Sequence, residues 1–254
     1  MPQIFSRAVL KLKYCVHTAL SLPPGLVQLR SIWPIVTAPA GAELLAHPAY
    51  VPVADTAGLP RVLLIGDSIS VGYTLAARGT LKGVANVHRP AENCAHSRNG
   101  LQRIGEWIRP GNWDVIHFNF GLHDISLKGG LPVVPPEEYR ANLLGIAEIL
   151  RGTGATLVWA STTPVPRDLH CVDPLRGTAF EQRAADVDLY NRIAAEVMAS
   201  QSIYVNDLNS LVKPCLAEIQ IPDDIHFSKA GDAFLGRHVA ACLRPLLASA
   251  GQRR

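Results

Sequence analysis

Three side chains in this sequence are of the types that nucleophilic catalysis requires. Ser68 follows a short apolar run, and Asp223 stands three residues before His226. A serine hydroxyl is a poor nucleophile at neutral pH, so it needs an imidazole to accept its proton and a carboxylate to orient that imidazole. We therefore predict acyl transfer, with Ser68 as nucleophile, His226 as base and then acid, and Asp223 as the partner of His226. Asp224 is a competitor for that last role, but the three-residue offset favours Asp223.

Acyl transfer also needs hydrogen-bond donors directed at the oxyanion of the tetrahedral intermediate. Ser68 begins a predicted helix directly after a predicted strand. The unpaired N–H groups and the dipole at a helix N-terminus favour negative charge. We therefore expect the backbone N–H of Ser68 to be one of the oxyanion donors.

The elements that must position these residues alternate between strands and helices. Short apolar runs rich in branched residues predict five buried strands, at Arg61–Gly66, Gly83–His88, Asp114–Phe120, Ala155–Ala160 and Ser202–Asn206. Helical stretches separate or follow them, at about 69–79, 100–108, 136–151, 185–200 and 228–249. This alternation predicts a parallel sheet with helices on both faces, a three-layer α/β/α sandwich.

The polar residues lie where such a topology places a site. Open α/β sheets bind their ligands beyond the carboxyl ends of the strands. Ser68 follows the first strand candidate, Asn93–His96 lie after the second, Gly121–Asp124 follow the third, and Asp223–His226 come after the fifth. We therefore expect these four segments to meet at one edge of the sheet.

The same segments resemble sequence blocks of a known family. Gly66–Ser70, which reads Gly-Asp-Ser-Ile-Ser, resembles the first block of the SGNH (GDSL) hydrolases. Gly121–Asp124 resembles their Gly-x-Asn-Asp block, and Asp223–His226 resembles their Asp-x-x-His block. The resemblance runs from Arg61 to the C-terminus, with the blocks in the expected order. It implies a flavodoxin-like fold with a five-stranded parallel sheet, ester hydrolysis without a cofactor or metal, and the three catalytic roles given above.

Two positions depart from the family pattern. The third block has His123 where an asparagine amide donates to the oxyanion, and a neutral imidazole N–H can serve the same purpose. The second block lacks its usual glycine, so the backbone donor is expected at Cys94 or Ala95. We assign supporting roles to three further residues that shape the loops, which are Asp67, Gly121 and Asp124.

Composition is that of one globular domain. The chain has 254 residues, of which 48% are hydrophobic and 18% charged, which suits a packed core rather than disorder. Its net charge of +3 and the lack of a dense Lys/Arg stripe argue against a nucleic-acid partner. No apolar run reaches the roughly 18–20 residues that cross a bilayer. We predict an N-terminal extension over 1–58 and a catalytic domain over 59–254, with the oligomeric state left open.

The extension has some features of an export signal. Basic residues precede residue 14, and an apolar stretch over 31–42 ends in small residues, as a cleavage region does. The order of charged and apolar segments is blurred, however. We expect export to the periplasm or the exterior, with a cytoplasmic location as the alternative.

We predict that the substrate is a small-molecule or glycan ester with a short acyl group, because the sequence offers no long apolar lid or Met-rich groove for an acyl chain. Residues 161–185 form a polar, charged insertion near the predicted site, where binding walls often lie. We expect an acetyl ester of a carbohydrate. The alternatives are lipase, lysophospholipase or thioesterase activity, a metal-dependent phosphoesterase that uses Asp67, His123, Asp124 and His226 as ligands, and a non-catalytic binding domain.

Overall fold

A computed structural model describes residues 47–109, 111–172 and 179–251. Its centre is a five-stranded parallel sheet with the strand order β2-β1-β3-β6-β9. The strands are β1 (Arg61–Ile65), β2 (Asn86–His88), β3 (Val115–Phe118), β6 (Thr156–Ala160) and β9 (Tyr204–Asn206). The strand order reverses direction at β1, which has β2 on one side and β3 on the other. In folds with this order, ligands bind at the carboxyl ends of β1 and β3.

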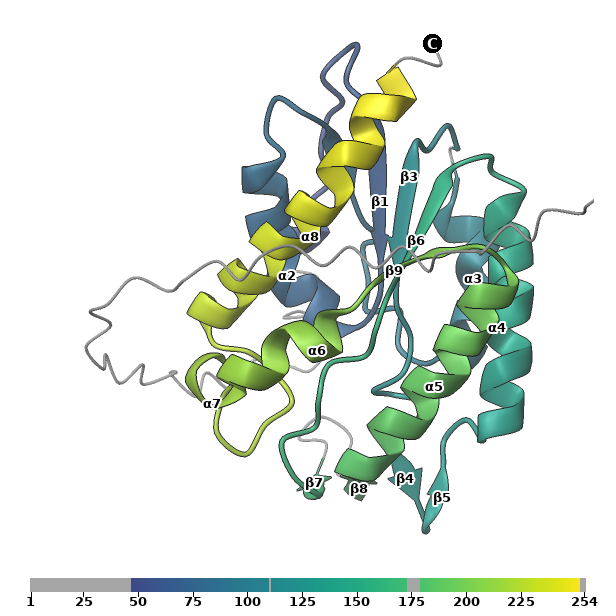
Figure 1. Ribbon diagram of the computed structural model, residues 1–254, viewed down its shortest axis with the longest axis vertical. Helices are drawn as coiled ribbons and strands as arrows, with labels where there is room; N and C mark the ends of the chain where they lie inside the picture. The colour runs from purple at the N-terminus through teal and green to yellow at the C-terminus, as the bar shows by residue number, and fades with distance from the viewer. Residues whose placement is uncertain (1–46, 110, 173–178, 252–254) are drawn as a thin grey trace, which may run out of the picture.

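Helices cover both faces of the sheet (Figure 1). The helices α2 (Ser68–Thr80) and α8 (Lys229–Gly251) lie on one face, and α3 (Ser97–Trp107), α4 (Pro136–Arg151) and α5 (Ala184–Ser200) lie on the other. Local sequence explains these boundaries. In α4, for example, Pro136 stands in the first turn with two glutamates, and Arg151 is the last residue, an arrangement that suits the helix dipole.

A second, smaller sheet lies at the end of the molecule where the central strands finish (Figure 1). It is antiparallel, with the order β5-β4-β8-β7, and its strands are β4 (Leu127–Lys128), β5 (Leu131–Pro132), β7 (Leu169–Val172) and β8 (Ala179–Gln182). The Gln182 side chain of β8 donates to the carbonyl of Leu122 at 2.7 Å. The small sheet is therefore anchored to the loop that follows β3.

Four short helical segments belong to the described part of the chain. They are η1 (Pro48–Tyr50), α6 (Leu208–Val212), η2 (Lys213–Cys215) and α7 (Leu216–Ile219). The first of them packs against α2, where Ala49 and Tyr50 are buried with Val71. The segments α6, η2 and α7 lead from the last strand to the loop before α8.

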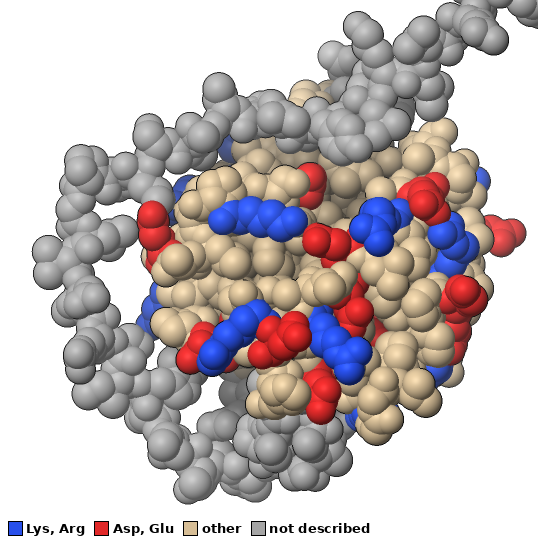
Figure 2. Space-filling view, turned by 60° about the horizontal axis from the view of Figure 1, so that its bottom comes forward, with Lys and Arg blue, Asp and Glu red and all other residues tan. Residues whose placement is uncertain are grey.

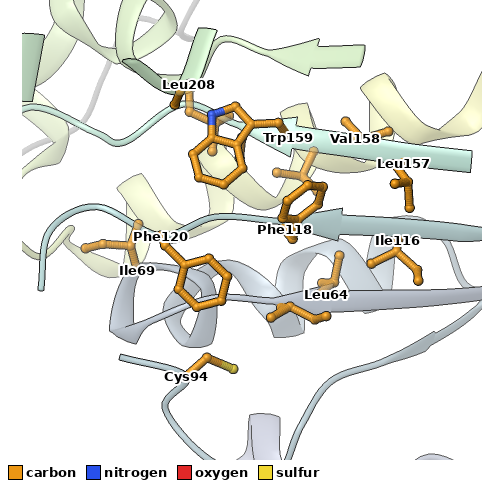
Figure 3. Close-up of a cluster of buried hydrophobic side chains, with 14 of the residues drawn as sticks. Leu64, Ile69, Cys94, Ile116, Phe118, Phe120, Leu157, Val158, Trp159 and Leu208 are labelled. Carbon is orange, nitrogen blue, oxygen red and sulfur yellow. The ribbon is translucent and has the colours of Figure 1, made fainter. Parts of the chain in front are cut away.

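The core fills the space between the sheet and the helices. Figure 3 shows its aromatic centre, where Phe118 of β3 and Trp159 of β6 meet edge to face with ring centroids 5.2 Å apart. Phe120 lies beyond the end of β3, and the Cys94 side chain approaches the core from a loop. Both of these side chains are fully buried. The residues that follow the strands are thus fixed by packing as well as by hydrogen bonds.

The predicted fold class is confirmed, because the five predicted strands form one parallel sheet between two layers of helices. The second strand is shorter than predicted, since a turn occupies 81–84 and the strand begins at Asn86. The strands β7 and β8, which were not predicted, lie within the polar insertion over 161–185. Most of the predicted extension lies outside the described residues. Within those residues, no helix is long and apolar enough to cross a membrane.

Candidate active site

Ser68 occupies the first position of α2, directly after β1. Asp67 is the N-cap of this helix, and its Oδ1 accepts the N–H of Ile69 at 3.0 Å. Asp67 is 1% exposed and its Oδ2 has no partner among the described residues. The N-cap arrangement leaves the N–H of Ser68 unpaired within the helix, as helix N-termini do. Asp67 therefore shapes the turn over residues 66–70, which is called the nucleophile turn below after the predicted nucleophile Ser68.

A relay of hydrogen bonds links Ser68 to an aspartate through His226. The hydroxyl Oγ of Ser68 lies 2.9 Å from Nε2 of His226. The other ring nitrogen, Nδ1, lies 2.7 Å from Oδ1 of Asp224, which also accepts the backbone N–H of His226 at 3.1 Å. A carboxylate at Nδ1 holds the tautomer whose Nε2 can accept the serine proton. The three side chains thus have the arrangement that a serine nucleophile, its base and an orienting acid require.

Asp223, predicted to be the partner of His226, does not occupy that position. Its side chain is 68% exposed and pairs with Arg167 at 2.7 Å. The physical reason is a turn in which the N–H of Asp224 donates to the carbonyl of Ile221 at 3.1 Å. Pro222 and Asp223 are the two central residues, and Asp223 has a φ of +61°, as type II turns require at their second central position. The turn directs Asp223 away from the histidine and leaves Asp224 beside it.

The loop that carries His226 is closed by backbone and side-chain hydrogen bonds. The N–H of Ile221 donates to the carbonyl of His226 at 2.9 Å, and Ser228 donates to Ile219 at 2.9 Å. The buried amide of Gln220 donates to the carbonyls of Pro164 and Ile225, both at 3.1 Å. Gln220 therefore connects the histidine loop to the segment after β6. Sequence reasoning missed this residue, because nothing local marks its long-range contact.

Asp224 and His226 stabilise each other's charged forms. The hydrogen bond that His226 makes to the Asp224 carboxylate raises the pKa of His226, against the opposing effect of burial. The same bond lowers the pKa of Asp224. A raised histidine pKa makes the imidazole a stronger base toward the serine proton. Asp67 and Asp232 raise the pKa of His226 further by their negative charge.

The two predicted backbone donors of the second block are already engaged. The N–H of Cys94 donates to the carbonyl of Gly66 at 3.3 Å, and the N–H of Ala95 donates to Oδ1 of Asn93 at 2.9 Å. Ala95 has a φ of +56°, a conformation usual for glycine or asparagine. The structure therefore differs from the expectation of a free donor here. The loop does lie against the nucleophile turn, as expected.

The residues after β3 form the third side of the site. Oδ1 of Asp124 accepts the N–H and the hydroxyl of Ser97, at 2.9 and 2.5 Å, so this carboxylate joins the loop to the first turn of α3. A Cβ on Gly121 would collide with the Thr162 side chain, which explains the glycine. His123 is half-buried. Burial lowers the pKa of His96, and the neighbouring His123, when protonated, lowers it further.

The residues of the metal alternative do not come together as a metal site. Asp67 caps α2 and Asp124 binds the start of α3, whereas His226 is held by Asp224. Among the described residues, no group of three or more His, Cys, Asp or Glu side chains could hold a metal ion. The geometry at Ser68 therefore assigns its polar residues to hydrogen bonding.

Comparison with known proteins gives matches in structure. No protein-family model matches the chain, and no curated protein matches it in sequence. An acetyl xylan esterase aligns with a TM-score of 0.60 and 14% identity, over 72% of this chain and 99% of that chain. A lipase/acylhydrolase from Enterococcus faecalis aligns with a TM-score of 0.57 and 22% identity, over 74% and 96%.

A candidate SGNH hydrolase from Slackia heliotrinireducens aligns with a TM-score of 0.55 and 17% identity, over 73% of this chain and 99% of that chain. The chain has the SGNH hydrolase fold. At these levels of identity the likeness establishes the fold, and the SGNH fold is what the sequence blocks predicted. The chemistry has to be argued from the site itself.

Proposed function

We propose that this chain is a serine esterase that hydrolyses carboxylic esters through an acyl-enzyme on Ser68. One observation carries the proposal, which is the continuous hydrogen-bond relay from Ser68 through His226 to Asp224. The relay lies at the carboxyl end of β1, where this topology places its ligands. Asp224 replaces the predicted Asp223 in the proposed mechanism.

The proposed reaction has two stages. In the first, Oγ of Ser68 attacks the ester carbonyl while its proton passes to Nε2 of His226. The C–O bond of the ester then breaks, and His226 returns that proton to the leaving alkoxide. In the second, a water molecule loses a proton to His226 and attacks the acyl carbonyl. The Ser68 ester bond breaks, the proton returns to Oγ, and the carboxylic acid leaves.

The oxyanion that forms in both stages needs hydrogen-bond donors. The N–H of Ser68 stands at the N-terminus of α2, where the helix dipole favours negative charge. We propose that the His123 imidazole supplies a second donor, since it stands at the position of the family's asparagine. The next residue, Asp124, accepts the N–H of Ser97 at the start of α3 and so holds the loop that carries His123.

Within this class, a short acyl group fits the site best. The cavity beside the nucleophile turn, lined in part by Asp67, Ile69 and Ser70, holds about 10 Å³, which is room for one water molecule. Two larger clefts hold about 330 and 360 Å³. Neither Ser68 nor His226 lines any of these three spaces, so none of them would hold a long acyl chain attached to Ser68.

A carbohydrate as the alcohol part of the ester agrees with the surface around the site. The acetyl xylan esterase of the same fold is named for such a substrate. Figure 2 turns the end of the molecule that holds the small sheet toward the viewer, and shows acidic and basic side chains interspersed on it. A face that carries charges of both signs, without a large patch of one sign, suits an uncharged ligand better than a polyanion.

The test is a panel of p-nitrophenyl esters from acetate to dodecanoate, followed by acetylated xylo-oligosaccharides, with Ser68→Ala as the control. We expect the highest kcat/KM for acetate and no turnover by Ser68→Ala. A preference for long chains would move the proposal to lipase or thioesterase activity, which uses the same triad. An absence of turnover with every ester by the folded protein would refute the esterase proposal.

A further inference from the structure

We propose that Arg89 is a positioning residue, whose buried guanidinium ties the nucleophile turn to the loop beside it and so sets the geometry of the oxyanion side. The inference rests on the proposed function for its catalytic consequence. Arg89 stands just after β2 and is 9% exposed. None of the segments that suggested the catalytic site contains it.

The guanidinium of Arg89 donates hydrogen bonds to two different parts of the site. On the nucleophile side, Nη2 donates to the carbonyl of Gly66 at 3.3 Å, and Nη1 donates to the hydroxyls of Ser70 and Thr74 at 3.1 and 3.0 Å. On the loop side, Nη2 donates to the carbonyl of Glu92 at 3.2 Å. One planar group therefore bridges the first turns of α2 and the loop that leads to Cys94.

The carbonyl of Gly66 is the centre of this arrangement. It accepts both the Arg89 guanidinium and the N–H of Cys94, each at 3.3 Å. Gly66 is two residues before Ser68, so rotation of its peptide would turn the segment that directs the Ser68 N–H. The Ser70 hydroxyl, which accepts a hydrogen bond from Arg89, in turn donates one to the carbonyl of Asp67 at 2.9 Å. Arg89 thus fixes the turn on both sides of Ser68.

The energetic cost of burying Arg89 supports a functional role. Among the described residues, no carboxylate lies within ion-pair distance of its guanidinium, and its partners are carbonyls and hydroxyls. A buried charge without an ionic partner is costly unless its hydrogen bonds are satisfied. The nearby ring of Tyr50, with its centroid 5.3 Å from Cζ of Arg89, stacks against the cation. A smaller or neutral side chain could pack here at a lower desolvation cost. The position therefore requires the N–H donors of a guanidinium group.

The experiment compares Arg89→Met, Arg89→Lys and a matched control, Arg78→Met. Arg78 lies on α2 and also donates to backbone carbonyls, those of Val87 and Pro48, at 3.0 and 3.5 Å. It does not contact the nucleophile turn. Two quantities are measured in each variant, namely kcat and KM for p-nitrophenyl acetate, and amide hydrogen exchange by mass spectrometry.

We expect Arg89→Met to lower kcat by roughly 10- to 100-fold, because small displacements of catalytic groups have effects of this size, while KM changes little. Exchange should accelerate in 66–70 and in 92–96 together. Arg89→Lys should recover part of kcat, since an ammonium keeps the charge and reaches only some of the acceptors. Arg78→Met should leave kcat and the exchange of both segments as in the parent protein.

The kinetic measurement and the hydrogen-exchange measurement together separate this inference from the esterase proposal. If the parent protein hydrolyses no ester, the proposed function fails, and the exchange of the two segments alone decides whether Arg89 couples them. Unchanged kcat and unchanged exchange in the Arg89 variants would overturn the inference. If Arg89→Met does not fold, Arg89→Lys decides, and parent-like kcat with parent-like exchange in that variant would also overturn it.

Discussion

Asparagine substitutions at Asp223 and Asp224 test which of two adjacent carboxylates serves His226. Each variant removes one negative charge, and the two positions differ by one residue, so each is the control for the other. Asp224 accepts the His226 ring at 2.7 Å and its backbone N–H at 3.1 Å. Asp223 instead forms an exposed ion pair with Arg167.

The expected losses differ because the two contacts differ in kind. A hydrogen bond between charged groups is worth about 1.5–3 kcal/mol, which at about 1.4 kcal/mol per factor of ten corresponds to a loss of roughly 10- to 100-fold in kcat. Asp224→Asn adds to this loss if its amide donates to Nδ1, because the histidine would then carry its proton on Nε2 and could not accept that of Ser68. An exposed ion pair is worth about 0–1 kcal/mol, so Asp223→Asn should lower kcat by at most about fivefold.

The assay is steady-state hydrolysis of p-nitrophenyl acetate by both variants, with thermal unfolding to show that each is folded. A larger loss of kcat in Asp223→Asn than in Asp224→Asn would refute the reasoning. It would mean that the turn at Pro222 rearranges in solution and brings Asp223 to the imidazole, at the spacing of the family's Asp-x-x-His block.

Three further results are expected. The acid limb of the kcat/KM pH profile should titrate above the ordinary histidine pKa, since Asp224 raises the pKa of His226 and only the neutral imidazole is a base. Asp224→Asn should move this limb to lower pH, and a limb that does not move would contradict the pairing of Asp224 with His226. Gly121→Ala should lower the free energy of unfolding in urea by about 1–3 kcal/mol through overpacking, whereas Gly105→Ala, where a Cβ meets nothing within 4 Å, should not. Burial raises the pKa of Asp124 from 3.8 to about 7. Between these pH values the folded state holds a proton that the unfolded state has lost, so the free energy of unfolding should fall as pH rises. Asp124→Asn should remove this part of the pH dependence, and the same pH dependence in the variant and the parent would refute the shift.

The main sheet and its helices could be predicted because their signals are local. Buried parallel strands such as β1 and β3 are continuous apolar runs, and their helices have clear boundaries. The small sheet gave no such signal. Its strands β4 and β5 have two residues each, and the pairing of β4 with β8 joins segments more than 50 residues apart in sequence. Tertiary contacts, rather than local propensity, decide such strands.

The structure brings the predicted pair Ser68 and His226 together, but the carboxylate beside His226 is Asp224 rather than the predicted Asp223. The order of the blocks was sufficient to bring Ser68 and His226 together, because the topology places their loops at one edge of the sheet. The acid depended on the conformation of a single turn. Pro222 followed by Asp223 is compatible with a type II turn, and that signal in the sequence could have indicated an outward Asp223.

Arg89 could not have been predicted from its sequence context. Arginine is usually exposed, and the partners of Arg89 come from α2, from the turn after β1 and from its own loop. Such a network exists only once the chain has folded. Gln220 was missed for the same reason, since its amide reaches a carbonyl 56 residues away in sequence.

The most direct test of the central claim is to trap the acyl-enzyme. The protein is mixed with p-nitrophenyl acetate, quenched in acid during the first turnover, digested with trypsin and analysed by mass spectrometry. We predict one acetyl group on the peptide that spans residues 62–78, with fragment ions that place it on Ser68, and no acetylation of that peptide in Ser68→Ala. Ester hydrolysis that proceeds without acetylation of Ser68, or that persists in Ser68→Ala, would contradict it.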